Sequence, residues 1–296
     1  MNRLSNDTTI ADLFQQHIEE KLCRFHTILK TTGWDEIVIG SGSGKIQFQD
    51  DMAYPFKVNP YFREWIPLDK RSKCFLRIQS NTDKPILYLN CAEDIWHTAP
   101  QSLPEGFAEP LEIIEYASID ALKKHLGKTQ DKTVLINETN DLGMPDSQWN
   151  PQQVLNAIDF QRRSKTAYEQ ACVRQATQLA MPAHRAAEQA FMAGASELEI
   201  ASAYLTACKR SENEMPYAII AGINQNAAVL HHHQLNNKAN AGDILIVLSG
   251  SGNSPNICRA LETAKQIGVF SYAVLAFDGG KSLNLADFPI HFPIND

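Results

Sequence analysis

Apolar residues recur every three or four positions over residues 8–30, and this spacing predicts an amphipathic opening helix that Gly33 closes. Four short apolar runs follow, and glycine, proline and asparagine separate them. They predict strands of a mixed sheet, with a helix over residues 118–126 between two of them. The runs are residues 36–39, 74–78, 86–89 and 133–136. A break near Asn150 and Pro151 predicts that an α/β domain covers residues 1–150.

The pattern changes to long helices from Thr166 onward. Thr166 with Glu169, and Ser196 with Glu199, have the spacing of a capping box, in which two side chains satisfy the first free amides of a helix. Pro182 is expected to kink or divide the first of these helices. Residues 217–233 have a strand-like composition that ends in a histidine triplet.

A continuous apolar strand is predicted over residues 243–248, after a polar stretch at residues 236–242. A Gly/Ser turn, Ser249 to Ser254, follows it. Ser254 is a plausible N-cap with Pro255 at the first helical position, and Gly268 ends the helix. A second strand over residues 269–276 completes a strand-helix-strand unit, which predicts parallel strands and a right-handed crossover.

Composition then narrows the function classes. The chain has 296 residues, 27 Lys+Arg and 34 Asp+Glu, with a formal net charge of −7 and no basic cluster. Nucleic acid and anionic membrane surfaces are therefore not expected as partners. The amino terminus lacks a signal-peptide layout, so we expect a cytoplasmic protein. The six cysteines are scattered and predict reduced thiols rather than a disulfide framework.

Two glycine-rich turns are candidate phosphate sites. In Gly40–Lys45 the spacing is one residue short of a nucleotide-binding loop, and Ile46 stands where a magnesium-binding hydroxyl belongs, which favours an ordinary loop. Ser249–Ser254 is the better candidate because its backbone amides and hydroxyls are expected to converge at the positive end of a helix. A plain tight connection remains the alternative for this turn.

The triplet His231-His232-His233 invites a metal interpretation. In a strand only His231 and His233 share a face, and nearby carboxylates are lacking, which favours a buried or substrate-facing histidine over a metal cluster. His184 and His97 are single histidines, for which structural roles are the default.

Several strings spread over residues 54–231 match one known family. They are Tyr54-Pro-Phe-Lys-Val-Asn-Pro60, Ile95-Trp-His97, Ser164-Lys-Thr166, Glu169-Gln-Ala-Cys172, His184-Arg-Ala-Ala-Glu188, Ala203-Tyr-Leu-Thr-Ala207, Pro216-Tyr217 and Ala227-Ala-Val-Leu-His231. By these strings, residues 1 to about 238 resemble the amino-terminal half of a bacterial Xaa-Pro dipeptidase, or prolidase, a metallopeptidase that cleaves dipeptides with a carboxy-terminal proline. The resemblance implies that residues 1–150 form an α/β domain that helps to form a homodimer, and that residues 160–238 begin a "pita-bread" catalytic domain, here truncated. It also implies that His231 is the substrate-side histidine.

The chain departs from that family in its metal ligands. The family binds two divalent metals, such as manganese, through two aspartates, a histidine and two glutamates in the motifs Asp-Ala-Gly, Asp-x-Thr-Arg and His-Gly-x-Gly-His, and none of these motifs occurs here. Such ligands activate the attacking water. We therefore expect no metal site or resident cofactor in this chain, and no peptidase activity from it alone. The remaining candidate donors after His233 are Asp243, Glu262, Asp278, Asp287, His291 and Asp296.

Three strings near the end of the chain match a different family. They are Leu248-Ser-Gly-Ser-Gly-Asn-Ser-Pro255, Phe277-Asp-Gly-Gly-Lys281 and Leu285-Ala-Asp287. By these strings, residues 241–296 resemble the second half of a sugar isomerase (SIS) domain, closest to phosphoheptose isomerases that act on sedoheptulose 7-phosphate. This resemblance implies that Ser249, Ser251 and Ser254 bind a sugar phosphate. The family's acid and base residues lie in parts that the chain does not match, so isomerase activity is not expected.

Together these observations predict an α/β chain with three parts: a mixed-sheet amino-terminal domain, an incomplete pita-bread fragment, and a partial parallel SIS-like unit. Three functions compete: a prolidase-related chain without catalysis, a phosphosugar-binding module, and a partner of an intact prolidase subunit.

Overall fold

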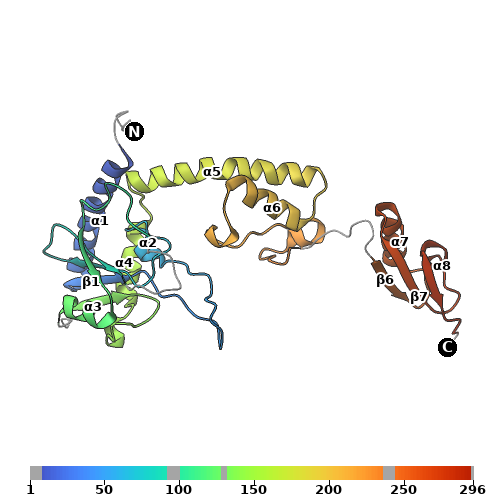
Figure 1. The fold of residues 1–296 in the computed structure, drawn as a ribbon, viewed down its shortest axis with the longest axis horizontal. Coiled ribbons are helices and arrows are strands. Elements are labelled where there is room, and N and C mark those ends of the chain that lie inside the picture. The colour runs from blue at the N-terminus through green and yellow to red at the C-terminus, as the bar shows by residue number, and fades with distance from the viewer. Residues whose placement is uncertain (1–8, 92–100, 128–131, 236–243, 295–296) are drawn as a thin grey trace. The chain divides into compact units, whose positions relative to one another are not determined.

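The computed structural model describes residues 9–91, 101–127, 132–235 and 244–294, which divide into two compact units, residues 1–178 and residues 179–296 (Figure 1). His97, in the string from Ile95, and residues 236–243 lie outside the described residues. In the first unit the elements are α1 (Ile10–Thr32), β1 (Glu36–Gly40), α2 (Pro60–Arg63), β2 (Phe75–Gln79), β3 (Ile86–Asn90), β4 (Glu112–Tyr116), α3 (Ile119–Leu126), β5 (Thr133–Ile136), the 3₁₀ turn η1 (Asp146–Gln148), α4 (Gln152–Arg162) and the start of α5 (Ala167–Met192).

Helix α1 confirms the predicted opening helix. Thr9 and Asp12 form a capping box at its start, and Gly33, with φ of 79°, adopts the left-handed conformation that ends it. The buried positions, which include Phe14, Phe25 and Leu29, follow one face of the helix. That face packs on the sheet.

The strands of this unit form one mixed sheet, as predicted, in the order β4-β3-β2-β1-β5; β4 is a strand that the sequence pattern did not predict. The β1–β5 and β3–β4 pairs are parallel, and the other two pairs are antiparallel. Alternate residues face opposite cores: Ile37 and Ile39 join the core under α1 and α4, whereas Val38 joins the core under α3. The sheet is therefore covered on both faces.

A buried carboxylate, Glu64, joins three elements of this unit. Its two oxygens lie 2.8 Å from Lys21 Nζ of α1 and 2.9 Å from Arg162 Nε of α4, and the side chains of Lys21 and Glu64 are 1% and 8% exposed. Lys21 also lies over the rings of Phe25 and Trp65. Burial lowers the pKa of Lys21, and the charge of Glu64 opposes that effect.

His17 extends this network to the first turn of α5. Its Nε2 lies 2.8 Å from the backbone oxygen of Glu64, and its Nδ1 lies 2.8 Å from Oγ1 of Thr166. Because a carbonyl only accepts, Nε2 donates, and neutral Nδ1 accepts from the Thr166 hydroxyl. Thr166 and Glu169 form the predicted capping box. Burial lowers the pKa of His17 to about 4.

The second unit begins within α5 and continues with α6 (Glu197–Cys208) and the 3₁₀ turns η2 (Glu212–Glu214) and η3 (Asn224–Ala228). Ser196 and Glu199 form the predicted capping box. Helix α5 continues through Pro182 and is not divided there, and a kink at this proline stays a prediction. The predicted strand over residues 217–233 is wrong, because these residues hold a 3₁₀ turn and irregular backbone.

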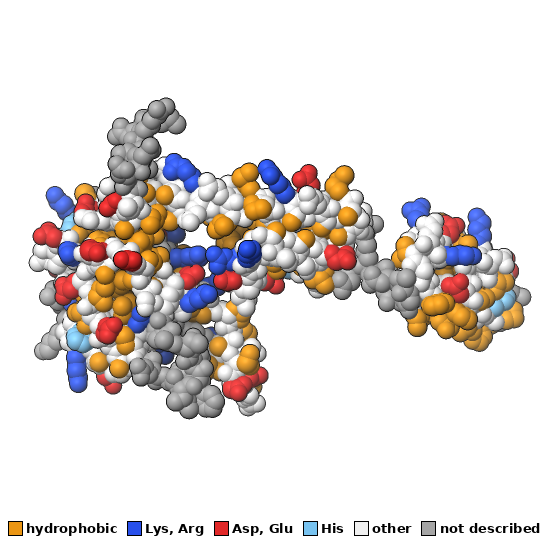
Figure 2. All heavy atoms as spheres, turned by 45° about the horizontal axis from the view of Figure 1, so that its top comes forward, with side chains coloured by type: hydrophobic (Ala, Val, Ile, Leu, Met, Phe, Trp, Pro, Cys, Tyr) orange, Lys and Arg blue, Asp and Glu red, His pale blue; other side chains and the backbone are white. Residues whose placement is uncertain are grey.

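The remaining elements form a three-stranded parallel sheet, β6 (Ile244–Ser249), β7 (Phe270–Leu275) and β8 (Phe288–His291), with helices α7 (Pro255–Ile267) and α8 (Ser282–Leu285). The predicted strand-helix-strand unit is thus confirmed. Val247, Leu261 and Ala273 form its core, whereas Ile246 and Leu248 on the other face are 68% and 73% exposed. Figure 2 shows apolar side chains gathered on this part of the chain.

All six cysteines lie among the described residues and are free thiols, as predicted. Within the described ranges, no helix combines the length and the apolar character that crossing a membrane requires.

The geometry of His17 predicts a pH dependence of stability. Its pKa in the folded chain lies below the unfolded value near 6.5, so the unfolded chain binds more protons between about pH 4 and 6.5. Stability of the first unit should therefore fall as the pH falls through this window, by about 3 kcal/mol for this group. Urea unfolding at several pH values measures it.

The matched variant for this measurement is His17→Gln, which keeps a donor and an acceptor but does not titrate. We expect its unfolding free energy to be less sensitive to pH between 4 and 6.5 than that of the parent chain. Equal slopes for the two chains would contradict the role assigned to His17.

Candidate functional site

The Gly/Ser turn lies between β6 and α7, where the predicted anion site was placed. Ser249 Oγ accepts from the amide of Gly252 at 3.0 Å, and Ser251 Oγ accepts from the amide of Asn253 at 3.3 Å. Ser254 is the N-cap of α7, as predicted, but its side chain makes no capping hydrogen bond. Two of the three predicted hydroxyls thus bind amides of their own loop, and each keeps its proton for donation.

A second loop, between β7 and α8, closes against this turn. Ser282 Oγ donates to the backbone oxygen of Gly252 at 2.7 Å, and the amide of Lys281 donates to Oδ1 of Asn253 at 3.1 Å. Gly252 has a φ of 64°, and a Cβ there would lie 1.9 Å from the backbone oxygen of Gly279. Only glycine fits this contact. The sequence analysis assigned no role to Asn253 or Ser282, because their partners lie about 30 residues away.

The other glycine-rich turn, Gly40–Lys45, follows β1. Ser41 is fully buried: its hydroxyl donates to the backbone oxygen of Arg71 at 3.0 Å and accepts from the amide of Cys74 at 2.9 Å. These bonds connect the turn to the start of β2. The hydroxyl serves the fold here and is not directed at a ligand.

The histidine triplet divides into two kinds of side chain. His232 Nε2 lies 2.9 Å from Oε2 of Glu197, and these side chains are 11% and 1% exposed. His231 and His233 are exposed, and their ring centroids lie 6.1 Å apart. Glu197 was not a sequence candidate, although its place at the first turn of α6, beside a capping box, was visible. The substrate-side role of His231 stays a prediction.

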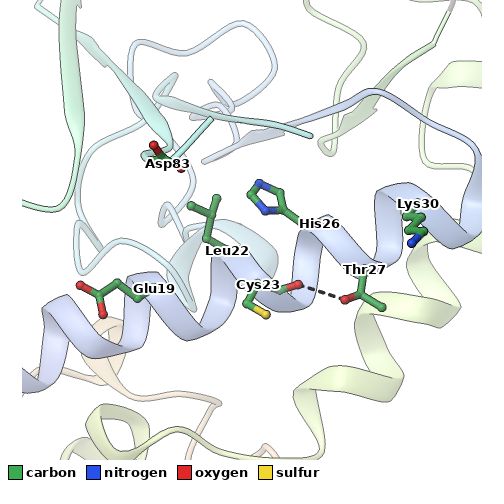
Figure 3. A pocket seen from close by; sticks show the side chains of 7 residues that line it. All are labelled: Glu19, Leu22, Cys23, His26, Thr27, Lys30 and Asp83. Carbon is green, nitrogen blue, oxygen red and sulfur yellow. Dashed lines mark hydrogen bonds between the residues drawn. The ribbon is translucent and has the colours of Figure 1, made fainter. Parts of the chain in front are cut away.

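The first unit has a shallow hollow of about 470 Å³ along α1 (Figure 3). Asp83, from the turn between β2 and β3, lies across from Leu22 and His26. His26 Nε2 is engaged by the backbone oxygen of Gln79 at 3.0 Å. The hollow is open, and its polar lining consists of two acids, a cysteine, a histidine, a threonine and a lysine. In this lining no nucleophile is hydrogen-bonded to a base, so the hollow does not define a catalytic centre. Its lining is Glu19, Leu22, Cys23, His26, Thr27, Lys30 and Asp83.

Two of the candidate donors that follow the triplet, Asp287 and His291, are separately engaged, whereas Asp243 and Asp296 lie outside the described residues. Asp287 accepts from the amide and the hydroxyl of Ser271 at 2.9 and 2.8 Å, and these bonds lower its pKa. His291 Nε2 lies 2.7 Å from the backbone oxygen of Phe277. Within the described ranges, no group of three or more His, Cys, Asp or Glu side chains could hold a metal ion. The described donors therefore do not fit a dinuclear metal centre.

Comparison with known proteins shows to which protein family this chain belongs. Residues 12–160 match the family model for the amino-terminal domain of Xaa-Pro dipeptidase, and residues 171–254 match metallopeptidase family M24. The chain therefore belongs to the Xaa-Pro dipeptidase family. The second match ends in the Gly/Ser turn, so it includes residues 241–254, which the sequence analysis compared with a sugar isomerase domain.

Curated relatives agree with this assignment. An Xaa-Pro dipeptidase of Pseudoalteromonas atlantica is 38% identical over 225 residues, covering 75% of this chain and 51% of that protein. One of Pseudoalteromonas haloplanktis is 36% identical over 285 residues, covering 93% of this chain and 64% of that protein. The chain thus spans between about half and two thirds of the length of these relatives.

The fold comparison gives a weaker likeness. A solved structure from Bacillus anthracis, provisionally described as an aminopeptidase P, matches 64% of this chain and 51% of its own, with 11% identity and a TM-score of 0.37.

The close contact between the β6–α7 turn and the β7–α8 loop, at Gly252 and Gly279, predicts the effect of one substitution. Gly252→Ala should destabilise the β6–β8 part by about 2–4 kcal/mol, because it adds a left-handed alanine and an overlap with a backbone oxygen. Gly250→Ala is the matched control, since a Cβ there meets only Phe277 at 3.8 Å. Hydrogen exchange of residues 270–275, measured by mass spectrometry, should accelerate in the first variant alone. An unchanged rate of hydrogen exchange in Gly252→Ala would show that the close contact between Gly252 and Gly279 is not formed.

Proposed function

We propose that this chain is a prolidase-family protein that does not by itself hydrolyse dipeptides with a carboxy-terminal proline. Family membership supports the first half of the proposal. The second half rests on the donor set: the printed sequence contains none of the family's metal-ligand motifs after His233. A water bridging two metals needs several anionic ligands in fixed geometry, and their loss removes the nucleophile.

The described donors support this proposal. Oδ2 of Asp287 accepts two hydrogen bonds from Ser271, and Nε2 of His291 lies against a backbone oxygen, so each side chain already has a partner outside any metal group. Glu197, the buried carboxylate of the second unit, is already committed to His232, Asn226 and the amide of Ile223. What remains of the peptidase site is the substrate-side residue His231.

Hydrolysis of Gly-Pro with saturating Mn²⁺ tests this proposal. We expect no release of proline above a metal-only control, because no group of three or more donors among the described residues could hold even one metal ion. Saturable turnover that disappears in His231→Ala would contradict the proposal, because it would show both an active centre and the use of this residue.

A second candidate is a phosphosugar-binding module, which one observation favours. The β6–α7–β7 unit has parallel strands with a Gly/Ser turn at the start of the helix, and a second glycine-rich loop packs beside it. Helix N-termini of this kind attract phosphate. In this module Ser249, Ser251 and Ser254 would donate hydroxyl protons to the phosphate oxygens.

Titration with sedoheptulose 7-phosphate tests the module. We expect it to shift the amide resonances of residues 249–254 in the NMR spectrum and to raise the melting temperature. Ser254→Ala should weaken both effects without unfolding, because its side chain makes no capping bond. If the resonances do not shift, or if the dephosphorylated sugar shifts them equally, the module proposal is wrong.

A further inference from the structure

We propose that His231 and His233 form a two-histidine binding site for a late first-row divalent cation, Cu²⁺, Ni²⁺ or Zn²⁺. Both imidazoles are exposed, their ring centroids lie 6.1 Å apart, and their planes differ by 31°. The two rings are therefore close neighbours, tilted relative to each other. The site is independent of the proposed function and uses neither of the family's carboxylate pairs.

The middle residue holds this pair in place. His232 is bound at 2.9 Å by Glu197, which also accepts from the amide of Ile223 at 2.9 Å and from Nδ2 of Asn226 at 2.8 Å. One buried carboxylate thus fixes the segment that carries the triplet at three points. With the central ring held inward, the two flanking rings remain on the exposed surface. Such preorganisation lowers the entropy cost of bringing two ligands to one ion.

The separation suits a shared metal after a small adjustment. A metal–nitrogen bond of about 2.1 Å places two rings in adjacent coordination positions with centroids about 4.5–5 Å apart. The rings must approach by about 1 Å, which rotation of exposed side chains allows. The remaining positions would be filled by water, so we expect exchangeable binding of moderate strength.

The donor chemistry selects the class of cation. Neutral imidazole prefers copper, nickel and zinc, and affinity increases from Mn²⁺ toward Cu²⁺. Among the described residues no carboxylate completes a group of three donors with these imidazoles, and two imidazoles alone favour this class over Mn²⁺, Mg²⁺ and Ca²⁺. From the sequence, the metal interpretation of this pair was disfavoured because nearby carboxylates are lacking; the close approach of the two exposed rings supports a site made of imidazoles alone.

Calorimetric titration of the full chain with Ni²⁺ tests the site, with His231→Ala, His233→Ala and a control variant, His125→Ala. His125 is another exposed histidine, on α3 of the first unit. We expect one Ni²⁺ per chain, at least tenfold weaker binding in each triplet variant, and a change below twofold in the control. Paramagnetic Ni²⁺ should broaden the ring resonances of His231 and His233 ahead of those of other histidines.

The substitutions remove only exposed rings, so circular dichroism should be unchanged. Nickel affinity that survives both triplet variants would overturn the proposal, as would equal broadening of His125 in the parent chain. The hydrolysis assay tests the proposed function independently of the Ni²⁺ titration, since it uses Mn²⁺ and measures released proline.

Discussion

The first unit depends on the buried carboxylate of Glu64. A buried charge costs several kcal/mol unless its pairs are complete, and here Lys21 and Arg162 complete them from two different helices. The arrangement therefore requires α1, α4 and the segment after α2 to come together at once. Through His17 and Thr166 the same network extends to the first turn of α5. Apolar packing stabilises this unit, and the polar network fixes where its helices lie.

The second unit uses similar devices on a smaller scale. The carboxylate of Glu197 accepts hydrogen bonds from the irregular segment at Ile223 and Asn226. Gly252 allows the β6–α7 turn and the β7–α8 loop to approach closely. Its parallel sheet has a helix-covered core on one face, while Ile246 and Leu248 are exposed on the other. Parallel sheets normally bury both faces. The described residues thus show a well-formed local fold with less burial than the first unit.

The sequence was sufficient to predict those helices and strands whose boundaries and spacing are specified by their own residues. Helical spacing and a glycine stop predicted α1, and turn chemistry with an apolar run predicted β6, α7 and β7. The edge strand β4 was missed because Glu112 and Glu115 interrupt its apolar character, and α4 was missed because no side chain caps it. Residues 217–233 were wrongly predicted as a strand because their backbone follows Glu197, a distant partner. For the same reason, the sequence could not show that His232 is the anchored histidine.

The proposed function requires that this chain, although it belongs to the Xaa-Pro dipeptidase family, does not bind the two metal ions that the family uses. Equilibrium dialysis against micromolar Mn²⁺ measures this directly, because it counts bound metal without requiring turnover. The account predicts far less than one Mn²⁺ per chain, since two imidazoles bind this ion weakly and, in the part of the chain that the structure describes, no carboxylate set accompanies them. Two Mn²⁺ bound per chain would contradict it, because that result would require a dinuclear centre.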